Sequence, residues 1–312
     1  MHIDVLDLLG AAAGGFLGAT FGALVAFVFT GFAVVIGVAV VIGTGSPDFL
    51  NSIAFGPFFG PQISFAAGVG ALAYAYRRGY ITSGRDIVTP LVSLGKPDVL
   101  LVGGAFGIFG YVIQQAVLII PGFGTKTDSV ATTVIISALV ARVIFGRSGI
   151  IGKHADGVVG WRRFTPNAQH VWLAYQQSPV MALLLGLFVG GMSAWSSVTL
   201  LHAYPNAPGV IYLGFGISAI SLLFLTSSVS VPATHHITLV PAVFVGAFMG
   251  HVAGGDTVVV LIGAGIGALT GLVGELFSRF WLIRGDTHID PPASAIWPMT
   301  VLVTVAAALF VS

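Results

Sequence analysis

The chain has 312 residues, of which 56% are hydrophobic and only 7% are charged, and its mean hydropathy is +1.00. An average soluble domain has roughly 25% charged residues, so this composition excludes an ordinary soluble protein and predicts a polytopic membrane protein. The formal net charge of +1 gives no basis for nucleic-acid binding, and the absence of Cys excludes disulfides, thiolate metal sites and cysteine nucleophiles.

The first half of the chain, residues 1–146, is expected to form one membrane repeat. Its first apolar run exceeds the ~20 residues that cross a bilayer, so it is either a long tilted helix or a helix broken at Gly14 and Gly15. A short later segment cannot span and is expected to be re-entrant or interfacial. The expected elements are helices over 8–43, 53–76, 98–120 and 129–145 and the short segment over 86–95.

A polar stretch over 147–177 is expected to link this repeat to a second one, residues 178–312, in which the same pattern returns. The matched pairs are Pro47 with Pro208, Phe55 with Phe215, Asp98 with Asp256, Gln115 with Glu275, and Asp128 with Asp290. This register predicts an internal duplication of the kind found in many transporters. Glycine runs over 103–107 and 263–267 lie inside apolar spans and indicate close helix packing.

The distribution of Lys and Arg favours four spans per repeat with a cytoplasmic N-terminus. We therefore expect an all-α polytopic membrane protein with about eight transmembrane helices in two homologous, parallel repeats. Residues 237–252, the expected counterpart of the short segment, decide the alternative: if they cross, ten spans and inverted repeats fit better. We expect the lipid bilayer of a prokaryotic plasma membrane as the setting, and a homo-oligomer is left open.

Two polar loops with a Thr-x-x-Asp pattern each precede an apolar helix. Because proline fits the first turn of a helix, the double proline after the second loop predicts a helix start with an Asp at the N-cap. In one interpretation the two helix N-termini converge near a pseudo-twofold axis and line a solute path. In the other, the Asp residues are caps and nothing more. The residues concerned are Thr125, Asp128, Thr287, Asp290, Pro291 and Pro292.

The second of these loops resembles the HPP family of four-helix integral membrane proteins, which is named for a His-Pro-Pro signature in this place. Residues 228–236, Ser-Val-Ser-Val-Pro-Ala-Thr-His-His, are similar to that family's earlier loop with Pro, Gln and His. Plant members of the family are associated with nitrite movement into plastids, so the resemblance implies a transporter of a small inorganic anion such as nitrite. The signature residues here are Thr287, His288, Pro291, Pro292, Ala293 and Ala295.

The histidines have three interpretations. His235 and His236 follow Pro232 and lie beside an apolar run, where they bond to backbone or water, line a transport path, or form half of a metal site. Adjacent helical residues point about 100° apart and chelate poorly, so no metal and no cofactor is expected. His288 joins them as a pathway candidate.

Glu275 lies within an apolar helix, and acids inside a membrane are by default candidates for ion or proton handling. The alternative is a structural ion pair with Arg279, four residues later. Gln115 stands at the matching position of the first repeat, so both repeats keep a hydrogen-bonding group there.

Three function classes are compatible with these features. The first is a transporter or channel for a small molecule or ion. The second is an intramembrane enzyme or lipid-binding protein, although the sequence offers Ser, Thr and scattered His rather than a nucleophile or metal constellation, which favours a non-enzymatic function. The third is a structural subunit of a membrane complex. The sequence favours the first class.

Overall fold

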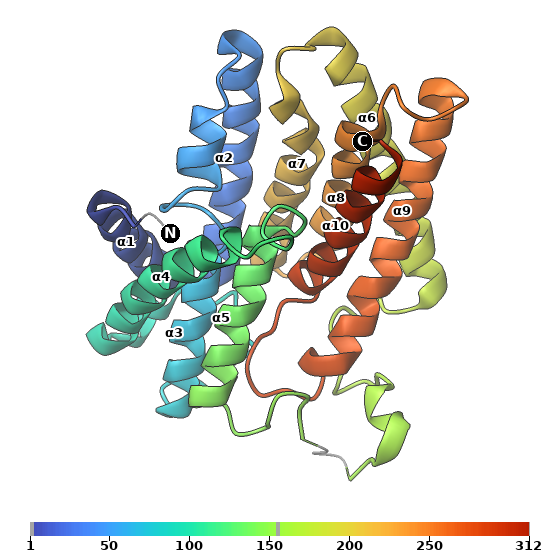
Figure 1. The fold of residues 1–312 in the computed structure, drawn as a ribbon. Coiled ribbons are helices and arrows are strands. Elements are labelled where there is room, and N and C mark those ends of the chain that lie inside the picture. The colour runs from blue at the N-terminus through green and yellow to red at the C-terminus, as the bar shows by residue number, and fades with distance from the viewer. Residues whose placement is uncertain (1–2, 154–156, 312) are drawn as a thin grey trace.

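The computed structural model describes residues 3–153 and 157–311, and this part of the chain is helical without a β-strand (Figure 1). Short 3-10 and π segments extend or connect ten α-helices. The first repeat contains α1 (Val5–Phe21), α2 (Ala23–Thr44), α3 (Ser64–Arg77), α4 (Pro97–Leu118) and α5 (Ser129–Phe145). The second contains α6 (Pro179–Ala203), α7 (Leu213–Ser221), α8 (His235–Phe248), α9 (Gly255–Phe277) and α10 (Pro291–Phe310).

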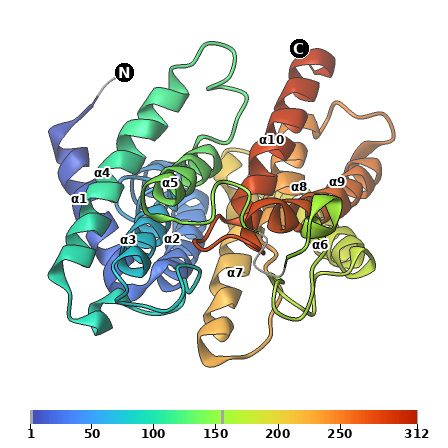
Figure 2. The same cartoon turned by 90° about the horizontal axis from the view of Figure 1, so that it is seen from below.

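The two repeats form two bundles of five α-helices that lie side by side, as the view from below shows (Figure 2). Within the first bundle α1 and α3 pack on α4, and α5 packs on α3; in the second α6 and α8 pack on α9, and α10 packs on α8. The bundles meet where α2 contacts α7 and where α5 contacts α10. Equivalent helices therefore meet each other at the centre of the molecule.

The central pair formed by α5 and α10 is antiparallel. Arg142, near the end of α5, bonds to Thr287, just before α10, whereas Thr304 of α10 bonds to the carbonyl of Lys126, just before α5. Figure 1 shows α5 and α10 running in opposite directions. Equivalent helices that are antiparallel are related by an approximate twofold axis perpendicular to them. The two repeats are therefore inverted, and the expected parallel arrangement is wrong.

The source of that error is the number of helices in each repeat. The run expected over 8–43 is two helices that separate at Gly22, not at Gly14 and Gly15. Gly22 has φ +87°, and a Cβ there would lie 2.9 Å from the carbonyl oxygen of Thr89. The positive φ and this close approach both disfavour a side chain. Glycine at this position therefore allows the chain to turn between the two helices. The extra helix gives five per repeat and reverses the direction of the second.

Other boundaries also differ from those expected. The helix expected over 53–76 is preceded by a π-helix, Leu50–Ala54, and becomes α-helical only at Ser64. Residues 86–95 are a loop that ends in a 3-10 helix, Leu91–Leu94. Residues 237–252 lie mostly within α8, which packs as the counterpart of α3. The short segment of the first repeat thus has no equivalent at 237–252.

Six helices in the part of the chain that the structure describes are long and apolar enough to cross a membrane. They are Ala23–Thr44, Pro97–Leu118, Pro179–Ala203, Pro208–Ser227, Gly255–Leu282 and Pro291–Phe310. The outer surface of α6 is apolar as well: Phe188 is 71% exposed, and Leu184 and Met192 are exposed beside it. Such a surface suits contact with hydrocarbon and not with water.

Glycines allow α1 to cross α4, and α6 to cross α9, at very short range. A Cβ at Gly15 would collide with the backbone of Gly103 and Gly107, and one at Gly186 would collide with the backbone of Gly267. The expectation that the glycine runs serve helix packing is confirmed, and the two crossings are equivalent in the two repeats.

The segment after Gly157 in the expected linker packs against the helices in part. Gln176 is buried, and its side-chain amide donates to the carbonyl of Ala233 and accepts from the N–H of the same residue at 3.1 and 3.0 Å. Trp172 and Leu173 pack against the main hydrophobic core. This segment is therefore attached to the loop that leads into α8.

Candidate functional site

A cavity of about 410 Å³ lies between the two repeats. Its walls come from α2, α3, α4, α5, α7, α8 and α10 and from the linker, and α1, α6 and α9 lie outside it. The N-terminal residues of α5, α8 and α10 all reach it. Its volume is in the range of sites for small organic molecules.

Asp128 and Asp290 both line the cavity and cap the helices that begin there. A carboxylate oxygen of Asp128 accepts from the N–H of Ala131 at 2.8 Å, and one of Asp290 accepts from the N–H of Ala293 at the same distance. The predicted N-caps are confirmed. Because α5 and α10 are antiparallel, the two carboxylates approach the cavity from opposite sides.

The loop before α10 brings His288 next to Asp290. Their Nε2 and Oδ1 atoms are 3.4 Å apart, and both residues line the cavity. The N–H of His288 donates to the carbonyl of Gly84 at 2.9 Å, which ties this loop to the loop after α3. Pro291 and Pro292 form the first turn of α10, and Pro292 lines the cavity.

His235 and His236 open α8 and are both buried. His235 lines the cavity and packs on Phe27, with ring centroids 4.6 Å apart, and its Nδ1 atom has no hydrogen-bond partner among the described residues. Within residues 3–153 and 157–311, both ring nitrogens of His236 are also without a hydrogen-bond partner. A buried polar atom without a partner is costly, so each is a candidate for binding water or a ligand.

Glu275 is buried in α9, and its Oε1 atom has no hydrogen-bond partner in the described part of the chain. No ion pair with Arg279 occurs within the part of the chain that the structure describes; Arg279 instead donates to the carbonyl of Gln177 at 2.9 Å. The chain changes from α-helix to π-helix at Ser278, which breaks the i,i+4 alignment that the ion-pair interpretation assumed. Glu275 does not line the central cavity.

The remaining candidates are not all at the cavity. Thr125 is exposed in the loop before α5, whereas Thr287 is buried within the loop before α10. Gln114, not Gln115, lines the cavity and bonds to Ser129 and to Gln62. A polar residue in this turn of α4 could be predicted from the sequence. Aligning the two repeats on Glu275 selected Gln115, whereas the residue at the cavity is its neighbour Gln114.

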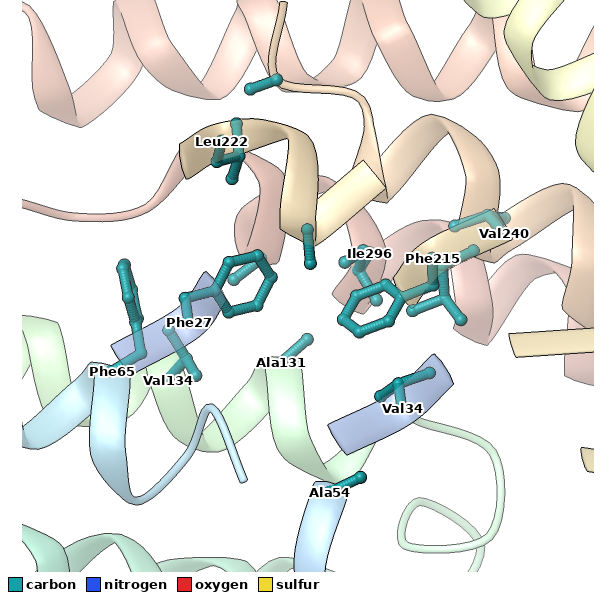
Figure 3. Close-up of a cluster of buried hydrophobic side chains, with 14 of the residues drawn as sticks. Phe27, Val34, Ala54, Phe65, Ala131, Val134, Phe215, Leu222, Val240 and Ile296 are labelled. Carbon is teal, nitrogen blue, oxygen red and sulfur yellow. The ribbon is translucent and has the colours of Figure 1, made fainter. Parts of the chain in front are cut away.

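The aromatic walls were not predicted from the sequence. Phe27, Phe65 and Phe215 come from α2, α3 and α7 and converge with Ala131, Val134 and Ile296 of the central helices (Figure 3). Phe27 packs edge-on against both other rings at 5.8 Å. Further aromatic lining comes from Phe55, Tyr212 and Trp172. Separate apolar helices give no sequence signal for such a meeting of side chains.

The loop before α10 is fastened by a buried arginine. Arg142 is 1% exposed; it donates to Thr287 Oγ1 at 2.9 Å and to the carbonyl of Ile150 at 2.8 Å. It also donates to the carbonyls of Trp281 and Thr287. Asp286 in the same loop accepts from the Ser148 hydroxyl at 2.6 Å. This loop is thus anchored to the end of α5.

Among the described residues, no group of three or more His, Asp or Glu has the spacing to hold a metal ion. A second, more open cavity of about 270 Å³ lies at the same end of the molecule as Arg142, lined by Arg85, Arg147, Lys153 and Arg284 around Asp286. Burial lowers the pKa of Arg85, and the carboxylate of Asp286 opposes this shift.

No similar curated protein and no similar solved structure was found. One family model matches the chain twice, over residues 1–170 and again over residues 162–311. The two matches cover the two bundles and confirm the internal duplication. The chain therefore belongs to a family of unknown function, DUF7973, and contains two copies of the unit that defines it.

Proposed function

We propose that the protein is a membrane transporter or channel for a small solute, with the cavity between the repeats as the solute site. The observation that carries the proposal is the position of this cavity. It lies where two inverted repeats meet, and the capped N-termini of α5 and α10 reach it from opposite sides. Inverted repeats around a central site are a common plan of secondary transporters.

The distribution of basic residues indicates which end of the molecule faces the cytoplasm. All of the 12 Lys and Arg residues except Lys126 lie at the end of the molecule where α3 and α5 finish. By the positive-inside rule this end is cytoplasmic. The N–H of Asp4 bonds to Tyr111 in the later half of α4, towards the opposite end, so the proposed N-terminus is outside. This reverses the orientation expected from the sequence, which assumed a single helix before Gly43.

A small inorganic anion is the solute that the HPP resemblance implies, and helix N-termini attract anions. In the cavity, however, the N–H groups of Ala131 and Ala293 are already bound to Asp128 and Asp290. The observations here therefore support transport more strongly than they support an anion.

Uptake by liposomes that contain the purified protein tests the proposal. The solute panel consists of nitrite, nitrate, formate, urea, ammonium and organic amines, each measured with and without a pH gradient. We expect one class to enter faster than into empty liposomes, and Asp290→Asn to reduce that uptake. Asp256→Asn is the control, because Asp256 is an exposed first-turn acid outside the cavity. No uptake of any solute by folded protein would contradict the proposal.

A further inference from the structure

The acidic and basic side chains around the central cavity are two carboxylates and two imidazoles, those of Asp128, Asp290, His235 and His288. Asp128 and Asp290 line it, and none of the described lining residues is Lys or Arg. Each Asp accepts from a backbone N–H with one carboxylate oxygen, and the second oxygen of Asp290 lies 3.4 Å from His288 Nε2. In an apolar site a carboxylate attracts a cation and repels an anion far more strongly than it does in water.

The walls suit an apolar body that carries such a charge. The rings of Phe27, Phe65, Phe215, Tyr212 and Trp172 surround the space, and aliphatic side chains fill most of the remaining surface. Aromatic faces attract cations through the ring quadrupole, and the attraction grows when the pair is desolvated. An apolar ligand that packs on the same faces is also bound favourably, because apolar surface is removed from water.

His235 provides a separate indication of a ligand. It is 6% exposed and lines the cavity, and no described residue forms a hydrogen bond with its Nδ1 atom. Its ring lies between Phe27 and Phe215, whose centroids are 4.6 and 6.0 Å away. In the tautomer protonated at Nε2, this nitrogen accepts a hydrogen bond, and an ammonium group has the N–H donors to supply it.

The size of the cavity separates organic from inorganic ions. At about 30 Å³ for each water molecule, 410 Å³ holds on the order of ten waters. A triatomic anion would leave most of this apolar space unfilled, whereas a small organic molecule would fill it.

We infer that the cavity binds an organic cation, an amine that is protonated at neutral pH and attached to an apolar or aromatic body. The ammonium group bonds to Asp128 or Asp290 and the body packs among the rings. As an account of what is transported, this inference rests on the proposed function; as an account of a binding site, it stands without it.

Calorimetric titration of the full-length protein in detergent tests the binding site. The probes are benzylamine, 2-phenylethylamine and 1-naphthylmethylamine, each compared with the alcohol and the carboxylate that share its body. We expect at least one amine to bind ten-fold or more tightly than its alcohol, and its carboxylate to bind more weakly still. If every amine binds no better than its alcohol, or any carboxylate binds best, the inference is overturned.

Two variants connect this preference to the carboxylates. Asn caps a helix as well as Asp does, so Asp128→Asn and Asp290→Asn remove a charge and keep the helix start. At least one of them should lose most of the amine preference, while Asp256→Asn should keep it. An unchanged preference in both cavity variants contradicts the inference.

Uptake assays then separate the two proposals. Selective amine binding without uptake would leave the cation site in place and remove the transport proposal. Uptake of an inorganic anion by a protein without amine selectivity would keep transport and overturn the organic cation.

Discussion

The loops that lead into α5 and α10 begin their helices in the same way but are fastened differently. In α5 the hydroxyl of Thr132 donates to the carbonyl of Asp128 at 2.7 Å, and in α10 the hydroxyl of Ser294 donates to that of Asp290 at 2.6 Å. The carboxylates cap the third residue of each helix equally. The duplication has thus kept the local geometry that starts each helix.

The fastening of the loops has diverged. Arg142 makes four hydrogen bonds beneath the loop before α10. At the equivalent position of α10, Thr304 makes one bond to the opposite loop, at the carbonyl of Lys126. A loop held by one neutral bond opens at lower cost than a loop held by a buried guanidinium. The comparison predicts that the Lys126 side of the cavity opens more readily than the His288 side.

Removal of the arginine should have the largest effect. Arg142→Met leaves the carbonyls of Trp281 and Thr287 and the Thr287 hydroxyl without their donor in a buried place, and each unsatisfied group costs about 1–3 kcal/mol. We expect destabilisation of roughly 3 kcal/mol or more, measured as a lower unfolding temperature in detergent. If Arg142→Met lowers the unfolding temperature no more than Thr304→Val does, the proposed difference in fastening between the two loops is wrong.

The glycine crossings should respond equally in the two repeats. Gly15→Ala and Gly186→Ala each push a methyl group against the backbone of a crossing helix, and overpacking of this kind costs about 1–3 kcal/mol. Both variants should lower the unfolding temperature to a similar extent. Gly265→Ala is the control, because a Cβ there meets nothing within 4 Å. If the two variants lower the unfolding temperature by clearly different amounts, the two glycine crossings do not contribute equally to stability.

Thr304→Val should have a smaller effect on stability and a clear effect on opening. Val keeps the shape of Thr and removes the hydroxyl donor to the carbonyl of Lys126, a loss of about 1 kcal/mol. Hydrogen exchange should accelerate in residues 119–127 and stay unchanged in residues 283–289. Equal acceleration of both loops would contradict separate fastening.

The cap variants should have the smallest effect on stability. Asp128→Asn and Asp290→Asn keep an N-cap oxygen, so the unfolding free energy should change by less than about 0.5 kcal/mol in each. Ala at either position removes the cap and should cost about 1 kcal/mol. If the Asn variants are as unstable as the Ala variants, the negative charge itself stabilises the fold. Amine binding by the Asn variants would then have to be corrected for the fraction of protein that is unfolded.

Features set by neighbouring residues could be predicted from the sequence. The caps at Asp128 and Asp290, the helix start at Pro291 and the glycine packing follow from local chemistry, and the duplication follows from the repeated pattern. The break at Gly22 depends on how closely the loop at Thr89 approaches, which no local pattern reveals. That one break determined the number of helices, the direction of the second repeat and the proposed orientation.

The cavity could be predicted only in part for a similar reason. Asp128, Asp290, His235 and His288 are polar residues at helix starts and are visible in the sequence as exceptions to an apolar pattern. The aromatic walls are apolar residues among many others, and only the meeting of α2, α3 and α7 selects Phe27, Phe65 and Phe215. The choice between Gln114 and Gln115 depends on helix rotation, which an alignment of the two halves does not fix.

The position of Trp172 makes the linker an optical probe of the cavity. Its indole lines the cavity and lies 6.5 Å from the ring of His236, whereas Trp161 and Trp195 are exposed on the outside. A molecule that enters the cavity changes the polarity around Trp172 and leaves those two indoles untouched. With the other four tryptophans replaced by Phe, its emission would report occupancy and closure in real time, without an attached dye.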